Sequence, residues 1–158
     1  MLRDSQRKTR KVFLPKKYFA GLSKTRKQQR VKEIRKFGAL SHKDPKAYVG
    51  FATNKGVKTK KSGYSQQWSR LYPEVKSLAD RAKVTGVPLR FIQASYDRGL
   101  AAWRTGHRPG ATQQQWGYAR VSSFLLCGKT YDTTDSDLAR KAKAASASAR
   151  SWWRRTCV

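Results

Sequence analysis

The positive charge of this chain is spread unevenly, and this limits which parts of it can fold unaided. Residues 1–61 contain twenty Lys and Arg residues and three acidic ones, a net charge of +17, whereas residues 62–158 carry +10 from sixteen basic and six acidic residues. The first segment has few apolar side chains to offset chain entropy and charge repulsion. The sequence therefore predicts a long, extended basic arm over residues 1–63 and a small, mainly α domain over residues 64–158.

Within the arm, the pattern predicts one short helix between two irregular stretches. Residues 1–21 are basic and are expected to be extended. Ser23 suits an N-cap and Gly38 a C-terminal stop, which together predict a helix that ends at Phe37. Its surface is so polar that it either stays a solvated basic helix or lies on a partner. Residues 38–63 are punctuated by Gly, Pro and Asn and are predicted to be a linker.

Beyond the arm, apolar residues recur at intervals of three and four, which is the spacing of one helix face. The first such pattern covers residues 65–82, and Pro73 either kinks this helix or begins a second one. Gly86 is expected to close it. Pro88 then begins a further helix, and Gly106 lies beyond its end.

Two more helices are predicted in the last third. Thr112 and Gln115 have the spacing of a capping box and predict a helix start. Residues 121–126 fit that helix, although they also fit a strand. The last helix is expected over residues 136–152, capped by Thr134 and Asp137.

The domain core is predicted from the large residues on these helix faces. We expect Trp103→Ala to be strongly destabilising, because truncating a buried aromatic ring costs about 3–5 kcal/mol. The predicted core residues are Trp68, Leu71, Val75, Leu78, Ile92, Tyr96, Leu100, Trp103, Trp116 and Phe124.

Residues 152–155 read Trp-Trp-Arg-Arg, and two interpretations of this sequence stay open. Two interfacial rings beside two cations suit a membrane–water boundary. The favoured alternative is a last helical turn that docks on the core through its tryptophans. No run of about eighteen apolar residues and no apolar N-terminal leader is present, so neither a membrane span nor a secretory signal is expected.

Catalysis and metal binding receive little support from the residue types present. Cys127 and Cys157 are too few and too isolated for a zinc site or a disulfide framework, and they suit synthesis in a reducing cytosol. His107, Cys127 and an aspartate from residues 132–137 could form a nucleophilic triad, but nothing local supports it. We expect these aspartates to cap a helix rather than to bind a cation. The sequence therefore predicts no enzyme, no cofactor, no metal and no small-molecule substrate.

The basic residues indicate an anionic partner without saying which one. Nucleic acid, an acidic protein surface and anionic lipid headgroups all satisfy such charge. Aromatic residues between the lysines are expected to anchor the arm in a neighbouring surface, unless they fold back on the chain's own domain. The candidate partner or anion contacts are Lys16, Lys17, Arg26, Lys27, Arg30, Lys58, Lys60, Lys61, Arg108 and Arg120. The candidate arm anchors are Phe13, Tyr18, Phe19, Tyr48 and Phe51.

Three blocks of the sequence resemble a viral protein family. They are KYFAGLSKTRKQQ at residues 17–29, the Lys-rich run at 58–62, and TGHRPGATQQQWGYARV at 105–121 followed by Ser123-Phe124. Together they are similar to small basic proteins of large nucleocytoplasmic DNA viruses, above all algal viruses such as the chloroviruses. The resemblance implies a virion setting and no catalytic residues.

These observations lead to two functional hypotheses. The first is a minor capsid, or cement, protein of a large icosahedral DNA virus, made in the host cytoplasm and located in the virion. Its arm would thread between the major and other minor capsid proteins and gain affinity as it orders, with inner-membrane lipids as a further partner. The alternative is a sequence-independent nucleic-acid-binding or packaging protein.

Overall fold

The computed structural model describes residues 14–57, 61–106, 108 and 110–158. The mainly α prediction is confirmed: the described residues form α-helices and short 3-10 helices and contain no strand. The α-helices are α1 (Lys24–Gly38), α2 (Gly63–Leu71), α3 (Leu78–Thr85), α4 (Leu89–Thr105), α5 (Gln113–Leu125), α6 (Lys129–Asp132), α7 (Ser136–Ala145) and α8 (Ala147–Thr156). The 3-10 helices are η1 (Lys16–Phe19), η2 (Pro45–Tyr48) and η3 (Ala52–Asn54).

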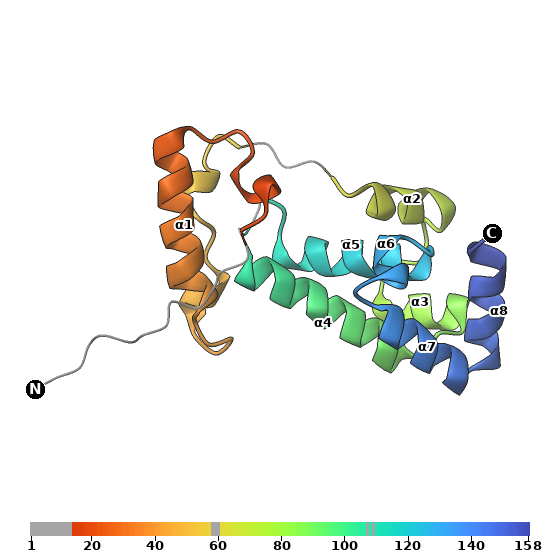
Figure 1. The fold of residues 1–158 in the computed structure, drawn as a ribbon. Helices are drawn as coiled ribbons and strands as arrows, with labels where there is room; N and C mark the ends of the chain where they lie inside the picture. Colours follow the sequence, from red (N-terminus) through yellow and green to blue (C-terminus); the bar gives the residue numbers. More distant parts are fainter. Residues whose placement is uncertain (1–13, 58–60, 107, 109) are drawn as a thin grey trace, which may run out of the picture.

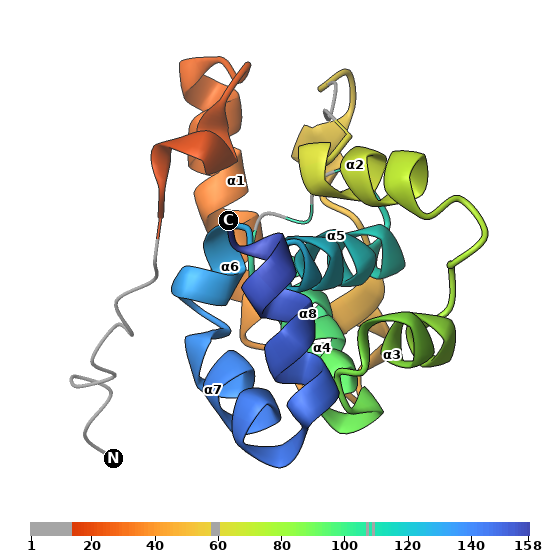
Figure 2. The same cartoon turned by 90° about the vertical axis from the view of Figure 1, so that its right-hand side faces the viewer.

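The body of the protein, residues 61–158, is built around the paired helices α4 and α5. Helix α5 lies between α4 and α2, and α8 lies beside α3 and α7 at the end of the molecule opposite α1 (Figure 1, Figure 2). Helices α4 and α5 approach closely because Gly99 faces Gly117: a Cβ at Gly99 would lie 2.8 Å from the Gly117 Cα. The sheet-free core is therefore organised by one tight helix crossing.

Local signals placed most helix ends correctly. The side chains of Ser23 and Thr112 accept hydrogen bonds from the backbone two or three residues on, and Thr112 forms the predicted capping box with Gln115. Gly86 ends α3 in the left-handed conformation, with φ of 73°, which glycine adopts without a steric penalty. Helices α2 and α3 are separate, and Pro73 lies in the loop between them.

The C-terminal part differs from the prediction in three ways. Residues 121–126 lie in and just after α5, so the strand alternative is wrong. The single long helix is broken at Ser146, whose hydroxyl donates to the Gly86 carbonyl and accepts from the Ala149 amide. The residue at the start of α7 is Asp135, not Thr134 or Asp137, and its carboxylate bonds to arginines instead of capping the helix.

The core also departs from the prediction at particular positions. Trp68, Ile92, Trp103 and Phe124 are buried as expected, but Leu71 at the end of α2 is 52% exposed. Leu71 is the last residue of its helix and has no neighbouring element to cover it. The other five predicted core residues are half-buried: Val75, Leu78, Tyr96, Leu100 and Trp116.

Trp152 and Trp153 belong to the core, as the docking interpretation expected. They are 5% and 1% exposed, and their indole N–H groups donate to the Leu125 and Phe124 carbonyls at 2.8 and 3.2 Å. The Phe124 and Trp153 rings meet edge to face, with centroids 5.2 Å apart. Helix α8 is therefore fixed to the end of α5.

The sequence analysis missed a disulfide. Cys127 and Cys157 form a disulfide bond with their Cα atoms 5.3 Å apart, so the statement that they are too isolated to pair is wrong. The docking of α8 through its two tryptophans brings the cysteines together across 30 residues of sequence. Sequence spacing carries no sign of this, because the proximity is created by the fold.

The first third of the chain is folded, not extended, wherever the structure describes it. Residues 14–57, here called the N-terminal lobe, consist of α1 and the three 3-10 helices, and they pack beside the start of the α4–α5 loop (Figure 1). Ile34 and Phe51 provide buried apolar contacts, and arginine side chains provide the rest. The predicted extended arm is thus corrected for residues 14–57; residues 1–13 lie outside the described part of the chain.

Candidate anion-binding surface

Helix α1 has an inner face that is held by hydrogen bonds within the lobe. Arg30, 1% exposed, donates to the Thr53 hydroxyl, the Tyr18 carbonyl and the Asn54 side-chain oxygen. Arg26 donates to backbone carbonyls of the same turn, and Glu33 accepts from the Thr53 amide and hydroxyl. Burial lowers the pKa of Arg30, and Glu33 partly offsets this. This network turns one face of a polar helix into a packed face.

The outer face of α1 is the opposite case. With Arg26, Arg30 and Ile34 turned inward, the 3.6-residue repeat points most of the helix's other basic residues to solvent. Lys36 also places its ammonium 5.3 Å from the Phe37 ring centroid. The exposed cations of this outer face are Lys24, Lys27, Lys32, Arg35 and Lys36.

Few acidic groups are left to neutralise this face. The ion pairs found among the described residues all lie in the body, where Arg98 and Arg120 bind Asp135 and Asp137. Glu33 is engaged inside the lobe as above. The outer face of α1 therefore presents uncompensated positive charge at one end of the molecule (Figure 1).

Arg108 fixes the lobe, and hence this surface, to the body. Its side chain is fully buried and donates to the backbone carbonyls of Arg104, Lys46, Val49 and Phe37 at 2.6–3.2 Å. Its guanidinium lies over three aromatic rings, with centroid distances of 5.2–5.6 Å. Burial lowers its pKa. Arg108 itself has φ of 44°, a left-handed conformation that residues with side chains seldom adopt.

The predicted anion contacts divide into two groups. Lys16, Lys17, Lys27 and Lys61 are exposed, as an anion contact requires. The assignments of Arg26, Arg30, Arg108 and Arg120 are corrected, because their guanidinium groups are occupied within the chain: three by backbone or side-chain acceptors of the lobe and its junction, and Arg120 by Asp135 at 2.8 Å. Lys58 and Lys60 lie outside the described residues.

The predicted arm anchors mostly serve the chain's own fold. Phe51 is 4% exposed and packs 5.9 Å from the Phe37 ring, while Tyr18 and Phe19 are half-buried. Tyr48 is the exception: it is 46% exposed, and its hydroxyl donates to the His42 carbonyl. Of the two open alternatives, folding back therefore holds for Phe51. Phe13 lies outside the described residues.

The remaining candidate chemistry is used structurally. Cys127 is in the disulfide and supplies no thiol, so the His107–Cys127–Asp arrangement is excluded; His107 itself lies outside the described residues. Asp135 is fully buried and accepts from Ser95, Arg98 and Arg120. Within the described ranges, no group of His, Cys, Asp and Glu has the arrangement of a metal site. No helix of the described residues is long and apolar enough to cross a membrane.

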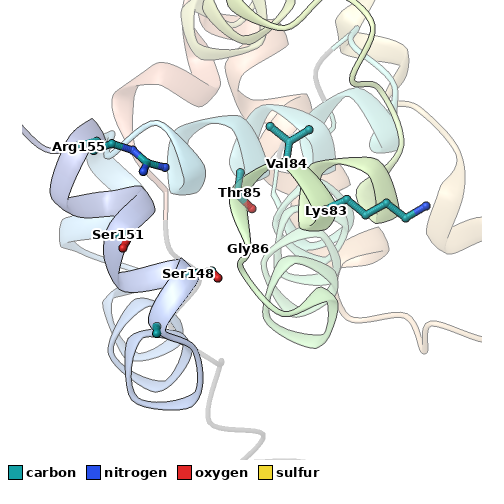
Figure 3. A pocket seen from close by; sticks show the side chains of 8 residues that line it. Lys83, Val84, Thr85, Gly86, Ser148, Ser151 and Arg155 are labelled. Carbon is teal, nitrogen blue, oxygen red and sulfur yellow. The ribbon is translucent and has the colours of Figure 1, made fainter.

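One surface hollow of about 440 Å³ separates α8 from the end of α3. Ser148, Ser151 and Arg155 line one side, and Lys83 and Thr85 the other (Figure 3). Lys83 extends away from α8 (Figure 3). The buried Thr85 hydroxyl already donates to the Arg81 carbonyl and accepts from the Val87 amide. This hollow therefore offers no unpaired buried group to a ligand.

A second hollow, of about 580 Å³, lies between α2, α3 and α5. Trp68, Tyr72 and Tyr118 form aromatic parts of its wall, and Arg81 and Lys76 contribute positive charge. Arg81 is 7% exposed, and burial lowers its pKa to about 10, with Tyr118 partly opposing the shift. Sequence reasoning missed Arg81, because a lone arginine beside the apolar stripe of α3 looks like a surface residue.

Sequence reasoning also missed most of the outer face of α1. Only Lys27 of its five exposed cations was among the predicted contacts. The signal that could have found Lys24, Lys32 and Arg35 was their common helical face, once the inward direction of Ile34 was taken as the reference.

The fold and this surface define a small, strongly basic, all-α protein in which buried arginines join a cationic lobe to a helical body. The chain belongs to a family of unknown function, DUF5824, which matches residues 15–142, or 128 of 158 residues. The matched region includes both the N-terminal lobe and most of the body. No curated protein and no solved structure shows significant similarity to the chain.

Proposed function

We propose that this protein is a non-catalytic binder of nucleic acid that works without sequence preference and uses the outer face of α1. The observation that carries the proposal is the row of exposed, unpaired cations on that face. The flanking lysines Lys16, Lys17 and Lys61 are exposed as well and extend the positive surface. Lys and Arg side chains neutralise phosphates and release condensed counterions, which favours binding to any sequence.

The dimensions of the helix suit a phosphate backbone. Lys24 and Arg35 are eleven positions apart, which is about 17 Å along a helix axis. Duplex DNA carries about ten phosphate charges over that length. Phosphate contacts position a protein but do not read bases, because sequence is read at the base edges. Lysine and arginine on a solvated helix face therefore predict affinity without sequence discrimination.

Sequence independence is tested by measuring binding to several unrelated duplexes of equal length by fluorescence anisotropy at physiological salt. We expect the affinities to agree within about threefold, since contacts to phosphates carry no sequence information. A preference of a hundredfold or more for one duplex would contradict the proposal. An anionic competitor without bases, such as heparin, should displace all the duplexes equally.

A second candidate function is that of a minor capsid component in a virion, and one observation favours it. Tyr48 and Val49 are neighbouring exposed residues, 46% and 52% exposed, with the exposed Lys43 and Lys46 beside them. A small apolar patch with cations at its rim suits an acidic protein surface. The resemblance to virion proteins points the same way. Cross-linking of intact particles should then join Lys43 or Lys46 to a capsid protein, and cross-links to nucleic acid alone would contradict this candidate.

A further inference from the structure

Arg81 differs from the other buried arginines in how its guanidinium is satisfied. It lies between two aromatic rings, with its Cζ 4.7 Å from the Trp68 centroid and 5.0 Å from the Tyr118 centroid. Its Nε donates to the Lys76 carbonyl at 3.2 Å, and its Nη1 donates to the Ser122 hydroxyl at 3.0 Å. The stacking fixes the plane of the guanidinium.

Part of the hydrogen-bonding capacity of Arg81 stays unused within the described part of the chain. A guanidinium has five N–H donors, and no acceptor among the described residues binds Nη2 of Arg81. No carboxylate among these residues pairs with it either. By contrast, all three nitrogens of Arg30 and of Arg108 donate to acceptors. Burying a cation without a counter-charge is costly, so Arg81 lacks a partner that its site would favour.

Arg81 also lines the hollow between α2, α3 and α5. The volume of about 580 Å³ is in the range of small-molecule sites. Tyr72 and Tyr118 are half-buried, so their rings provide apolar surface that remains accessible. The exposed Lys76 stands at the same hollow and adds a second cation. A buried guanidinium, a surface ammonium and aromatic walls thus converge on one space.

We propose that this hollow binds a small organic anion in which a flat ring carries a carboxylate or a phosphate. The oxyanion accepts from the unused N–H groups of Arg81 and is attracted by Lys76, because guanidinium–oxyanion hydrogen bonds are charge-assisted and directional. The ring lies against the aromatic wall formed by Tyr72 and Trp68. The proposal is independent of nucleic-acid binding by α1, since the hollow lies in the body and the outer face of α1 in the lobe.

The test uses the full-length protein and four probes at physiological salt, with isothermal titration calorimetry as the readout. Benzoate supplies a ring with a carboxylate and adenosine monophosphate a ring with a phosphate; adenosine and inorganic phosphate supply the separate halves. We expect at least one of the ring-bearing anions to bind with a stoichiometry of one and at least about tenfold more tightly than either half. Which of the two binds identifies the oxyanion. Failure of both to bind would overturn the proposal.

Arg81→Met keeps the length of the side chain and removes its charge. We expect it to weaken binding about tenfold or more, while Arg70→Met, on the exposed end of the adjacent α2, leaves it unchanged. Equal binding by Arg81→Met and the wild type would overturn the proposal. If Arg81→Met does not fold, Tyr72→Ser decides, because Tyr72 is half-buried: weaker binding supports the assigned wall, and unchanged binding contradicts it.

Discussion

The Nη2 group of Arg108 donates a hydrogen bond of 2.9 Å to the carbonyl oxygen of Phe37, a residue 71 positions earlier in the chain. In return, the side-chain amide of Asn54 donates to the carbonyl of Arg108. The end of α4 and the N-terminal lobe are therefore joined by polar contacts to backbone groups, at a junction where apolar burial is small. The position of the cationic face of α1 depends on this junction.

Replacing Arg108 should release the lobe without unfolding the body. Arg108→Met leaves four backbone carbonyls without their donor, and we expect a loss of about 3–5 kcal/mol from the stability of the junction. Hydrogen exchange should show amides of residues 24–57 losing protection while those of α4 and α5 keep theirs. Arg140→Met, at an exposed site on α7, is the matched control. Equal loss of protection in lobe and body would show that the two fold as one cooperative unit.

The crossing of α4 and α5 should not tolerate a methyl group. Gly99→Ala would place a Cβ 2.8 Å from the Gly117 Cα and 3.0 Å from the Trp116 carbonyl, both backbone atoms that cannot move aside cheaply. We expect about 1–3 kcal/mol of destabilisation in urea denaturation. Gly63→Ala, where an added Cβ meets nothing within 4 Å, should be neutral or slightly stabilising. Similar effects of the two changes would contradict the close crossing.

Asp135 and Asp137 both bind Arg98 but differ in burial, and their replacement should differ accordingly. Asp135 is fully buried, so Asp135→Asn leaves buried arginine charge unpaired and should cost about 3–5 kcal/mol. The Asp137 side chain is 37% exposed, so Asp137→Asn should cost about 1 kcal/mol or less, and less still at high salt. Thermal denaturation at two salt concentrations separates the two outcomes.

The smaller effect should depend on pH. The hydrogen bond from Arg98 holds the pKa of Asp137 well below its usual range. A lowered pKa in the folded state stabilises the protein above the unfolded-state pKa of about 4, and the contribution is lost as the pH falls below that value. The stability difference between wild type and Asp137→Asn should therefore be full at pH 7 and shrink below pH 4. A difference that grew in acid would contradict this pairing.

Reduction of the Cys127–Cys157 disulfide should lower the stability of the protein but leave α8 in place. The bond closes a loop of 30 residues, for which the chain-entropy estimate is about 3–4 kcal/mol. We expect a lower melting temperature in reductant, with near-ultraviolet circular dichroism of the docked tryptophans retained below the transition. The double variant Cys127→Ser, Cys157→Ser should melt like the reduced protein and not respond to reductant. A wild-type melting temperature that ignores reductant would contradict the pairing.

The parts of the fold that were predictable from sequence depend on near neighbours. Ser23, Gly86 and the pair Thr112–Gln115 act within three or four positions, so their roles as caps are visible in the sequence itself. The burial of Trp68 and Ile92 follows from helical spacing in the same way. Leu71 fits that spacing too, but it is exposed because its helix ends there, which no local pattern reveals.

The parts that were missed depend on contacts between distant residues. Charge density alone predicted an extended arm, because it treats every arginine as solvated. Arg30 and Arg108 are instead buried against carbonyls 12 to 71 positions away, so they stabilise the lobe that they were expected to keep open. Most of the cationic face of α1 was missed for the same reason: which lysines face outward is decided by which arginines face inward.

The central claim is that the outer face of α1 binds nucleic acid through its phosphates, and the salt dependence of DNA binding tests it most directly. The outer-face variant replaces Lys24, Lys27, Lys32 and Arg35 with Gln, and a matched far-end variant replaces the exposed residues Arg140, Lys141, Arg154 and Arg155 with Gln. Each phosphate contact adds about 0.9 to the slope of log K against log salt. We predict that the outer-face variant loses about 3 to 4 from the magnitude of this slope and the far-end variant less than about 1. Equal slopes for the wild type and the outer-face variant would contradict the account.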